Sequence, residues 1–260
     1  MLPEERRNKI LEMLKGVALC SMTELVKQLE VSRVTVVRDI AFLEKAGIVT
    51  KVHGGAKLRN EDNPPYEALF KVRMNRNLPR KQAIGREAAL LPKDDSTIFI
   101  DSSTTSYAFA LELLKRKFLH LNIITNSPAI LSAARETTGV TIIATGGELN
   151  PMFNMLGGLW VADFLDKINF DAAFISASGI SEKLNLTTSS IDLANILNKV
   201  ISKTPRVHLL ADSSKLSKQE MINICPLSRC SLLVTDDGIT PDQELRFRDI
   251  VDLKIARLRA

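Results

Sequence analysis

The sequence between residues 32 and 40 reads Ser32-Arg33-Val34-Thr35-Val36-Val37-Arg38-Asp39-Ile40. Within it and just after it, Val36, Ile40 and Leu43 recur at i, i+4 and i+7, which is the spacing of one buried helical face. Hydroxyl and arginine side chains fall on the other side of the same helix. The stretch therefore predicts a short amphipathic helix with a basic polar face and with Ser32 as its N-cap.

A second motif follows as Lys51-Val52-His53-Gly54-Gly55-Ala56. The two glycines predict a tight turn, and the short apolar runs on both sides predict a pair of strands. A hydroxyl-and-arginine helix that leads into a basic hairpin is what a winged helix-turn-helix places in the major groove and against the adjacent phosphates. The two motifs together predict DNA binding.

Two further helices are expected before these motifs. One begins at Pro3, and the next is capped by Ser21 with Glu24 in the capping-box position. Three short helices followed by a hairpin form a consistent winged arrangement. We therefore expect residues 1–58 to form a winged helix-turn-helix DNA-binding domain, with the helix-turn-helix at about residues 20–39.

The charge of the chain is unevenly distributed. Its 260 residues suggest two domains, and its net charge is +5. Residues 1–59 hold 11 Lys and Arg against 7 Asp and Glu, whereas residues 60–260 hold 24 against 23. The positive excess lies with the predicted DNA-binding domain, as expected if only that end meets a polyanion. A solvated basic surface without such a partner is the alternative.

No motif points to export, to a membrane span or to a metal. The basic residues near the N-terminus are not followed by an apolar run, and no segment approaches the length of a membrane span. Cys20, Cys225 and Cys230 lack paired metal spacing, and the three histidines lie far apart. We expect a cytoplasmic protein with reduced cysteines and without a cofactor.

The pattern changes after residue 58. Residues 59–80 are expected to be a linker: the range begins polar and proline-bearing, and Phe70 to Arg80 is then basic and is expected to be a helix or an arm that bridges the domains. Residues 81–260 alternate short apolar strands with helical segments, which is typical of a Rossmann-like α/β domain whose mostly parallel sheet is covered on both faces. The strands are expected at residues 97–100, 122–125, 140–143, 173–175, 207–210 and 231–234.

Small polar residues follow the ends of these predicted strands. The loops read Asp101-Ser102-Ser103-Thr104-Thr105-Ser106, Thr125-Asn126-Ser127, Thr145-Gly146-Gly147, Ser176-Ala177-Ser178-Gly179 and Asp212-Ser213-Ser214-Lys215. Ligands of such folds bind past the carboxyl ends of the strands, and N–H groups at a helix start can hold a phosphate. The loops therefore predict a small, polar, phosphorylated ligand, although ordinary capped turns use the same residue types.

The order of these motifs resembles that of the DeoR family of bacterial transcription regulators. The resemblance covers nearly the whole chain, from Arg6 and the helix after Ser32 to Leu210-Ala211-Asp212-Ser213-Ser214-Lys215. It implies a winged helix-turn-helix joined to a sensor domain related to sugar-phosphate isomerases and CoA transferases. It also implies an oligomeric regulator of a sugar-catabolism operon, usually a repressor that a phosphorylated sugar releases from double-stranded operator DNA.

Two sets of site residues follow from the motifs and the resemblance. We expect DNA contacts from Ser32, Arg33, Thr35, Arg38, Lys51 and His53. We expect the effector pocket to be framed by Asp101, Ser102, Ser103, Thr104, Thr105, Asn126, Gly146, Gly147, Gly179 and Lys215.

The chain departs from the family pattern at four positions. Val37 stands where many relatives carry a second basic residue, and Ser103 stands where glycine is usual. Leu193 and Leu197 lie near positions where relatives often carry a glutamate and a basic residue. These departures predict an altered operator or effector preference.

A sugar-phosphate isomerase with an accessory nucleic-acid domain is the alternative function, and an activator on the same scaffold is a third. Isomerase chemistry needs a positioned base and a cation, which Asp101, Asp171, Asp212 and Lys215 could supply. Asp at a strand end before small residues is more often a cap, and the glutamate expected near residue 193 is absent. We therefore expect a regulator and not an enzyme.

Overall fold

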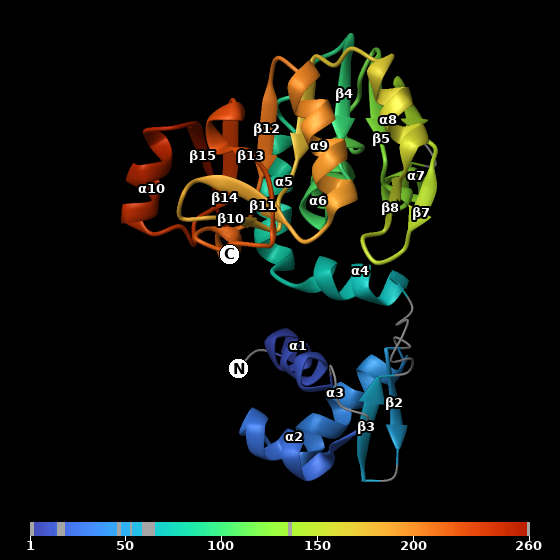
Figure 1. Ribbon diagram of the computed structural model, residues 1–260, viewed down its shortest axis with the longest axis vertical. Helices are drawn as coiled ribbons and strands as arrows, with labels where there is room; N and C mark the ends of the chain where they lie inside the picture. The colour runs from blue at the N-terminus through green and yellow to red at the C-terminus, as the bar shows by residue number, and fades with distance from the viewer. Residues whose placement is uncertain are drawn as a thin grey trace. The chain divides into compact units, whose positions relative to one another are not determined.

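The computed structural model describes residues 3–14, 19–45, 48–52, 54–58, 66–134 and 137–258. The chain divides into two compact units, Met1–Arg76 and Asn77–Ala260, each drawn in Figure 1. Among the described residues, no helix is long and apolar enough to cross a membrane.

The first unit contains short helices and a small antiparallel sheet. Its helices are α1 (Pro3–Leu14), α2 (Met22–Leu29), α3 (Arg33–Lys45) and α4 (Tyr66–Asn75), and its strands are β1 (Cys20–Ser21), β2 (Val49–Val52) and β3 (Gly55–Leu58). The sheet order is β1-β3-β2. The three helices and the hairpin agree with the sequence prediction, whereas β1 is too short to show a periodicity.

The caps expected in this unit are present. Ser21 caps α2 and forms the capping box with Glu24. The Oγ atom of Ser32 accepts a hydrogen bond from the backbone N–H of Thr35 at 3.3 Å, so Ser32 caps α3. These caps satisfy donors that a helix leaves without intrahelical partners, and they fix where the two helices begin.

A buried ion pair joins α1 to α3. The carboxylate of Asp39 on α3 is 2% exposed, and it accepts hydrogen bonds from Arg6 and, at 2.9 Å, from Nε of Arg7. The guanidinium of Arg7 also lies 3.7 Å from the centroid of the Phe42 ring. The apolar face of α3, with Val36, packs into the same core. The orientation of α3 is therefore fixed from both sides.

The second unit is built around a seven-stranded parallel sheet with the order β15-β14-β12-β9-β4-β5-β6. These strands are β4 (Ser96–Ile100), β5 (Leu121–Thr125), β6 (Val140–Ala144), β9 (Ala172–Ile175), β12 (Val207–Leu210), β14 (Leu232–Asp236) and β15 (Asp252–Ala256). All six predicted strands form, within two residues at either end. The prediction did not include β15.

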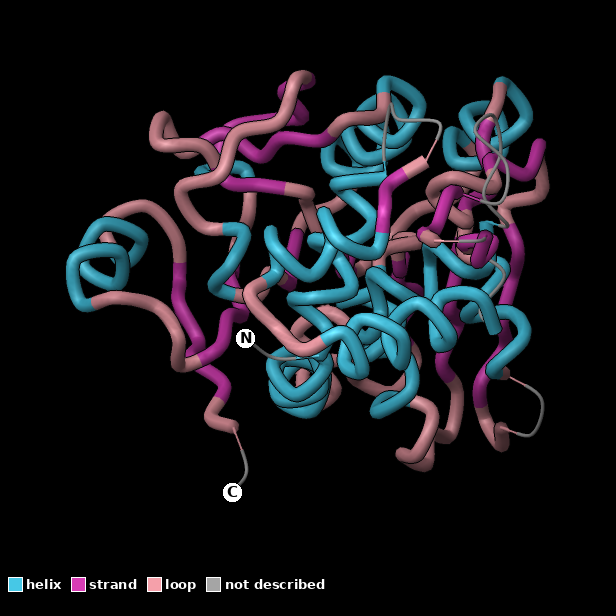
Figure 2. The backbone as a smooth tube through the Cα atoms, turned by 90° about the horizontal axis from the view of Figure 1, so that it is seen from below, coloured by secondary structure: helices cyan, strands magenta, loops and turns pink. Residues whose placement is uncertain are grey.

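Helices cover both faces of this sheet. The helices α5 (Leu78–Ala88), α6 (Thr104–Leu113) and α7 (Pro128–Ala133) pack against one face, and α8 (Leu159–Asp166) and α9 (Ile191–Lys203) pack against the other. The remaining helix, α10 (Pro241–Arg248), stands beside β15 at one end of the unit (Figures 1 and 2). The α/β architecture expected from the alternating pattern is therefore present.

Smaller elements complete the second unit. A hairpin of β7 (Glu148–Asn150) and β8 (Met155–Gly157) follows β6, and β10 (Gly179–Ile180), β11 (Asn185–Thr188) and β13 (Ile222–Pro226) form a separate antiparallel sheet. Two single turns of 3₁₀ helix are η1 (Ser213–Lys215) and η2 (Leu227–Arg229). The range 59–80 that was expected to be a linker contains α4 and the first residues of α5.

Candidate nucleic-acid interface and effector site

The exposed face of α3 carries the predicted DNA-contacting arginines. Arg33 and Arg38 are exposed, whereas the Thr35 hydroxyl lies 2.9 Å from that of Ser32 within the cap of the helix. Between these polar residues, Val34 is 63% exposed. An exposed valine on a groove-reading helix can contact a thymine methyl group, and the sequence analysis did not single it out.

The hairpin that follows α3 carries a second basic position. Lys51 is exposed on β2, and its backbone N–H donates to Oε1 of Glu44 on α3 at 3.0 Å. Gly54 has a φ of +86°, and a Cβ atom at Gly55 would lie 2.2 Å from the carbonyl oxygen of Cys20. Glycine is therefore required at both positions of the turn. The remaining predicted contact, His53, lies outside the described residues.

Asp101 lies at the carboxyl edge of the parallel sheet, directly after the inner strand β4. It is fully buried. Its Oδ1 atom accepts from the backbone N–H and from the hydroxyl of Ser103, at 3.2 and 2.8 Å, and its Oδ2 atom accepts from the backbone N–H of Ser176 at 3.0 Å. Burial raises the pKa of Asp101 above its ordinary value, although these hydrogen bonds oppose the shift.

Lys215 brings a positive charge to the same edge. Its Nζ atom donates to Oγ of Ser176 at 2.8 Å and to Oγ1 of Thr105, in the first turn of α6, at 3.3 Å. Ser102 and Thr105 are buried at the start of α6, and Thr104 is half-buried beside them. The structure thus connects five of the predicted effector residues, Asp101, Ser102, Ser103, Thr105 and Lys215, around one helix N-terminus.

The turn that carries Lys215 contains a second buried carboxylate, Asp212. Its Oδ1 atom accepts from the hydroxyl of Ser214 and, at 3.2 Å, from the backbone N–H of Ser214. Burial alone raises the pKa of Asp212, but the charge of Lys215 and the Ser214 hydroxyl outweigh it, and the net pKa is below its ordinary value. The site therefore pairs an ionised aspartate with a lysine.

Three residues of α5 and its cap contribute to this turn, and the sequence analysis missed them. Asn77 donates to Oδ1 of Asp212 at 3.0 Å, and Arg80 donates to Oγ of Ser213 at 2.7 Å. The Nε atom of Arg80 also lies 3.7 Å from Oδ2 of Asp236, and the buried Lys81 acts on Asp212 electrostatically. Asn77, Arg80 and Lys81 fell in or next to the range expected to be a linker, and the basic character of Arg80 and Lys81 was the available signal.

The other predicted effector residues lie in different surroundings. Asn126 is fully buried, and its Nδ2 atom donates to the carbonyl of Leu156 in the β7–β8 hairpin at 3.3 Å. Gly147 has a φ of +104°, and a Cβ atom there would meet the carbonyl of Gly157 at 2.4 Å. The neighbouring Gly146 also has a positive φ, and Gly179 lies in β10 against the carbonyl of Lys218. These three glycines occupy backbone positions that packing or a positive φ requires.

The four departures from the family pattern also have defined positions. Val37 is half-buried against the core of the first unit. Ser103 caps α6, because its Oγ atom accepts from the backbone N–H of Ser106 at 3.1 Å. Leu193 and Leu197 of α9 are buried in the core. All four residues are therefore explained by packing or capping.

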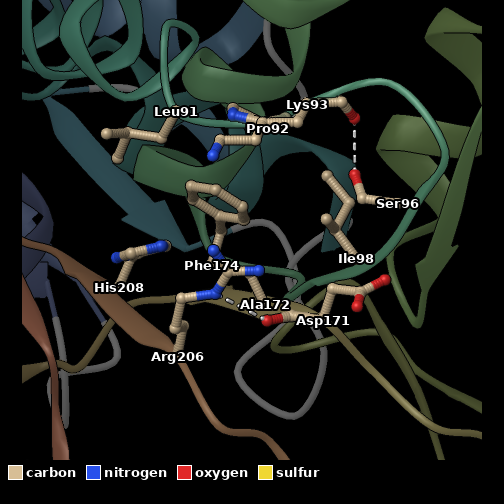
Figure 3. Close-up of a pocket in the computed structure, with 10 residues that line it drawn as sticks. All are labelled: Leu91, Pro92, Lys93, Ser96, Ile98, Asp171, Ala172, Phe174, Arg206 and His208. Atoms are coloured by element: carbon tan, nitrogen blue, oxygen red, sulfur yellow. Dashed lines mark hydrogen bonds between the residues drawn. The ribbon is translucent and has the colours of Figure 1, made fainter.

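A small pocket opens at the opposite, amino edge of the sheet (Figure 3). Its lining includes Arg206, His208 and Asp171, and Nε of Arg206 donates to the backbone carbonyl of Asp171 at 3.2 Å. Burial, and to a lesser extent the charge of Arg206, lowers the pKa of His208 to about 4. Asp171 lies at this edge, away from Lys215, so it does not belong with the carboxylates of the effector site.

The fold and the two sites together define a class of protein. A winged helix-turn-helix with exposed arginines precedes an α/β unit with a polar, charged site at its strand ends, as in DNA-binding regulators that carry a ligand-sensing domain. Two family descriptions match the chain: "DeoR-like helix-turn-helix domain" over residues 6–62 and "DeoR C terminal sensor domain" over residues 76–237. The chain belongs to the DeoR family of transcriptional regulators.

Relatives over nearly the full length agree with this assignment. The chain is 32% identical to the HTH-type transcriptional regulator GolR of Listeria innocua over 257 residues, which is 98% of this chain and 100% of that protein. It is 30% identical to the lactose phosphotransferase system repressor of Lactococcus lactis, covering 93% of this chain and 94% of that one. It is 27% identical to a putative aga operon transcriptional repressor of Escherichia coli, covering 92% and 88%.

Solved structures with a similar backbone are more distant. Ribose 5-phosphate isomerase A of Methanocaldococcus jannaschii overlaps 52% of this chain and 53% of its own, with a TM-score of 0.38 and 20% identity. This similarity is too low to bear on activity.

Proposed function

We propose that this regulator is a repressor of a sugar-catabolism operon, and that a phosphorylated sugar bound at the carboxyl edge of the sheet releases it from its operator. The observation that carries the proposal is the position of Lys215, whose Nζ atom lies within hydrogen-bond distance of Ser176 and Thr105 at the start of α6. A lysine beside the N-terminus of a helix, with hydroxyls around it, suits a phosphate group. Repressors of sugar operons among the relatives support the same assignment.

The rest of the effector would contact the neutral polar groups of the same edge. The Oδ1 atom of Asn126 is buried and has no hydrogen-bond partner among the described residues. A buried acceptor of this kind is costly unless a donor reaches it, and a sugar hydroxyl is a suitable donor. Phosphate at Lys215 and a hydroxyl at Asn126 would together favour a sugar phosphate over free phosphate.

The proposed function does not include catalysis or a cofactor. A general base must have an oxygen available to the substrate proton. Both oxygens of Asp101 accept hydrogen bonds from Ser103 and Ser176, and the apolar Leu193 and Leu197 of α9 are buried. We therefore assign the buried carboxylates a binding and positioning role in a cytoplasmic, homo-oligomeric DNA-binding protein.

Operator binding tests this function directly. The full chain is titrated onto its own upstream intergenic DNA at one fixed physiological salt concentration, with and without pentose and hexose phosphates. Tight binding that outcompetes random DNA and is abolished by one sugar phosphate is the expected result. Weak binding that is sequence-blind and steeply salt-dependent would instead mean a generic polyanion surface. Turnover of a panel member would favour the isomerase alternative.

A substitution at the start of α6 tests the site. Thr104→Ala is expected to weaken sugar-phosphate binding, because Thr104 is the first residue of the helix and lies half-buried next to Thr105. Isothermal titration calorimetry with the releasing sugar phosphate measures the change. Unchanged affinity would show that the pocket is wrongly assigned, and Thr97→Ala, at a half-buried threonine near the amino end of β4, is a matched control at the opposite edge of the sheet.

A further inference from the structure

The boundary between the two compact units falls between two polar residues, Arg76 and Asn77. α4 ends at Asn75 and α5 begins at Leu78, so Arg76 and Asn77 are the residues that connect these two helices. The first unit ends with Arg76, and the second begins with Asn77. Rotations about the backbone of these two residues therefore set the direction in which α4 leaves α5.

Asn77 holds an uncommon backbone conformation. Its φ of 56° and ψ of 32° lie in the left-handed region, which is unfavourable for a residue with a Cβ atom and which asparagine adopts more readily than most. Asn77 occupies the N-cap position of α5, but its side chain makes no capping hydrogen bond. Its side chain instead donates from Nδ2 to Oδ1 of Asp212 at 3.0 Å and to Oγ of Ser214 at 2.9 Å.

Both acceptors belong to the turn that also carries Lys215. Asp212 is the N-cap of the 3₁₀ turn that ends at Lys215, and it holds the turn through Ser214. A phosphate that binds Lys215 therefore arrives close to the carboxylate to which Asn77 is bonded. The charge of Lys215 already acts on Asp212, so a negative charge bound at Lys215 repels the Asp212 carboxylate, and this repulsion acts on the turn.

Arg80 also donates a hydrogen bond to the turn that carries Lys215, but it does not connect this turn to α4. It donates to Ser213 and lies near Asp236, but it is located inside α5. It therefore anchors the turn to the helix and does not bear on the backbone between α4 and α5. Among the described residues bonded to this turn, Asn77 is the one that is also part of that connection.

We propose that Asn77 couples the effector site to the DNA-binding unit, a step that rests on the sugar-phosphate sensing proposed above. In the operator-binding form, the two hydrogen bonds to Asp212 and Ser214 hold Asn77 in its left-handed conformation. An anionic ligand at Lys215 shifts the turn and breaks these bonds. Asn77 then relaxes and changes the direction in which α4 leaves the sensor unit.

Two substitutions in the full chain separate this role from a merely structural one. Asn77→Gly keeps the left-handed backbone accessible and removes both hydrogen bonds. Asn77→Asp keeps the size of the side chain but places a second carboxylate against Asp212. Asn154→Gly is the matched control, because Asn154 also has a left-handed backbone, with a φ of 51°, and lies in the β7–β8 turn of the same unit.

Operator affinity is measured by fluorescence anisotropy, and ligand affinity by calorimetry with ribose 5-phosphate and fructose 6-phosphate as probes. Both Asn77 variants are expected to bind the operator roughly tenfold more weakly without a ligand, and the additional release caused by the sugar phosphate is expected to shrink to about twofold or less. Because coupling is reciprocal, Asn77→Gly, which adds no charge to the site, binds the sugar phosphate at least as tightly as the wild type. Asn154→Gly leaves both affinities unchanged.

Three results would overturn the coupling: wild-type release in Asn77→Gly, operator affinity unchanged in both Asn77 variants, or weaker sugar-phosphate binding in Asn77→Gly. If neither probe nor any other sugar phosphate releases the wild-type protein, it is the proposed function that fails. In that case, the operator affinities of the wild type and the two Asn77 variants, measured without a ligand, show whether Asn77 contributes to operator binding. Thermal unfolding of each variant establishes that a loss of operator affinity is not a loss of the fold.

Discussion

Two buried aspartates, one in each unit, have opposite surroundings. Asp39 in the DNA-binding unit is bonded to the guanidinium groups of Arg6 and Arg7. Asp101 in the sensor unit accepts its hydrogen bonds from neutral donors of Ser103 and Ser176. The first arrangement is a closed ion pair that fixes two helices. The second leaves a buried carboxyl group sensitive to any charge that enters the site, which is what a sensor requires.

The largest expected effect comes from removing Asp39. Asp39→Ala removes the buried carboxylate shared by Arg6, which is 8% exposed, and by the half-buried Arg7. Breaking a buried ion pair costs about 3–5 kcal/mol, which is enough to unfold a small unit. We expect an early urea-unfolding transition by circular dichroism and loss of operator binding. Asp166→Ala, which removes an ion pair with Lys199 whose aspartate is 55% exposed, is expected to cost less than about 1 kcal/mol.

His208 extends the comparison to a half-buried imidazole, which becomes positively charged when it binds a proton. Its pKa of about 4 lies below the ordinary 6.5, so between these values the unfolded chain binds a proton that the folded chain does not. Stability is therefore expected to fall by up to about 3 kcal/mol as the pH decreases from about 6.5 to 4. Urea unfolding over this range measures the slope. His208→Leu, which retains a contact with Phe174, is expected to flatten it; an unchanged slope would assign the effect to other groups.

Arg38 is the exposed counterpart of the buried Arg6 and the half-buried Arg7. Because its guanidinium is not held by a core aspartate, Arg38→Ala is expected to leave stability unchanged and to weaken operator binding by roughly 1–3 kcal/mol if it contacts a base. Competition with random DNA distinguishes the two kinds of contact. An equal loss on both DNAs would identify a phosphate contact, and an affinity unchanged on both would remove Arg38 from the interface.

The smallest effect is expected at Asp101. Asp101→Asn keeps the shape but replaces one acceptor oxygen with a donor, which costs about 1–3 kcal/mol in the sensor unit. Because the folded pKa of Asp101 is raised, its contribution to stability is full below the unfolded pKa and decreases as the pH rises through the folded pKa. The difference in the free energy of unfolding between the wild type and Asp101→Asn, measured by urea unfolding, should therefore be larger in acid than at neutral pH. A difference that grows toward neutral pH would contradict the shift.

The sequence predicted those parts of the molecule in which a local pattern reflects burial. β4, β5, β9 and β12 are runs of apolar residues buried on both faces of the sheet, and such runs are visible without any knowledge of their neighbours. The N-caps Ser21 and Ser32 were predicted for a similar reason, because capping depends on residues three positions apart.

The partners of the effector turn could not be predicted in this way. Asn77 and Asp212 are 135 positions apart, and their contact depends on how α5 packs at the carboxyl edge. A polar residue before a basic helix has the composition of a linker, and composition alone does not reveal the carboxylate that it reaches. Gly147 and Gly179 were assigned to the effector pocket, but tight backbone packing accounts for glycine at both positions. The sequence could not separate the two explanations, because a ligand-binding loop and close backbone packing both favour glycine.

The strand order of the parallel sheet has a consequence for the synthesis of the protein. The first strand made, β4, lies inside the sheet and pairs with β9, whose residues follow more than 70 positions later, and the edge strand β15 is made last. The DNA-binding unit has its own core and precedes all of them, so it can fold on the ribosome first. A nascent or prematurely ended chain can therefore contain the core of the DNA-binding unit before it contains Asp212 and Lys215.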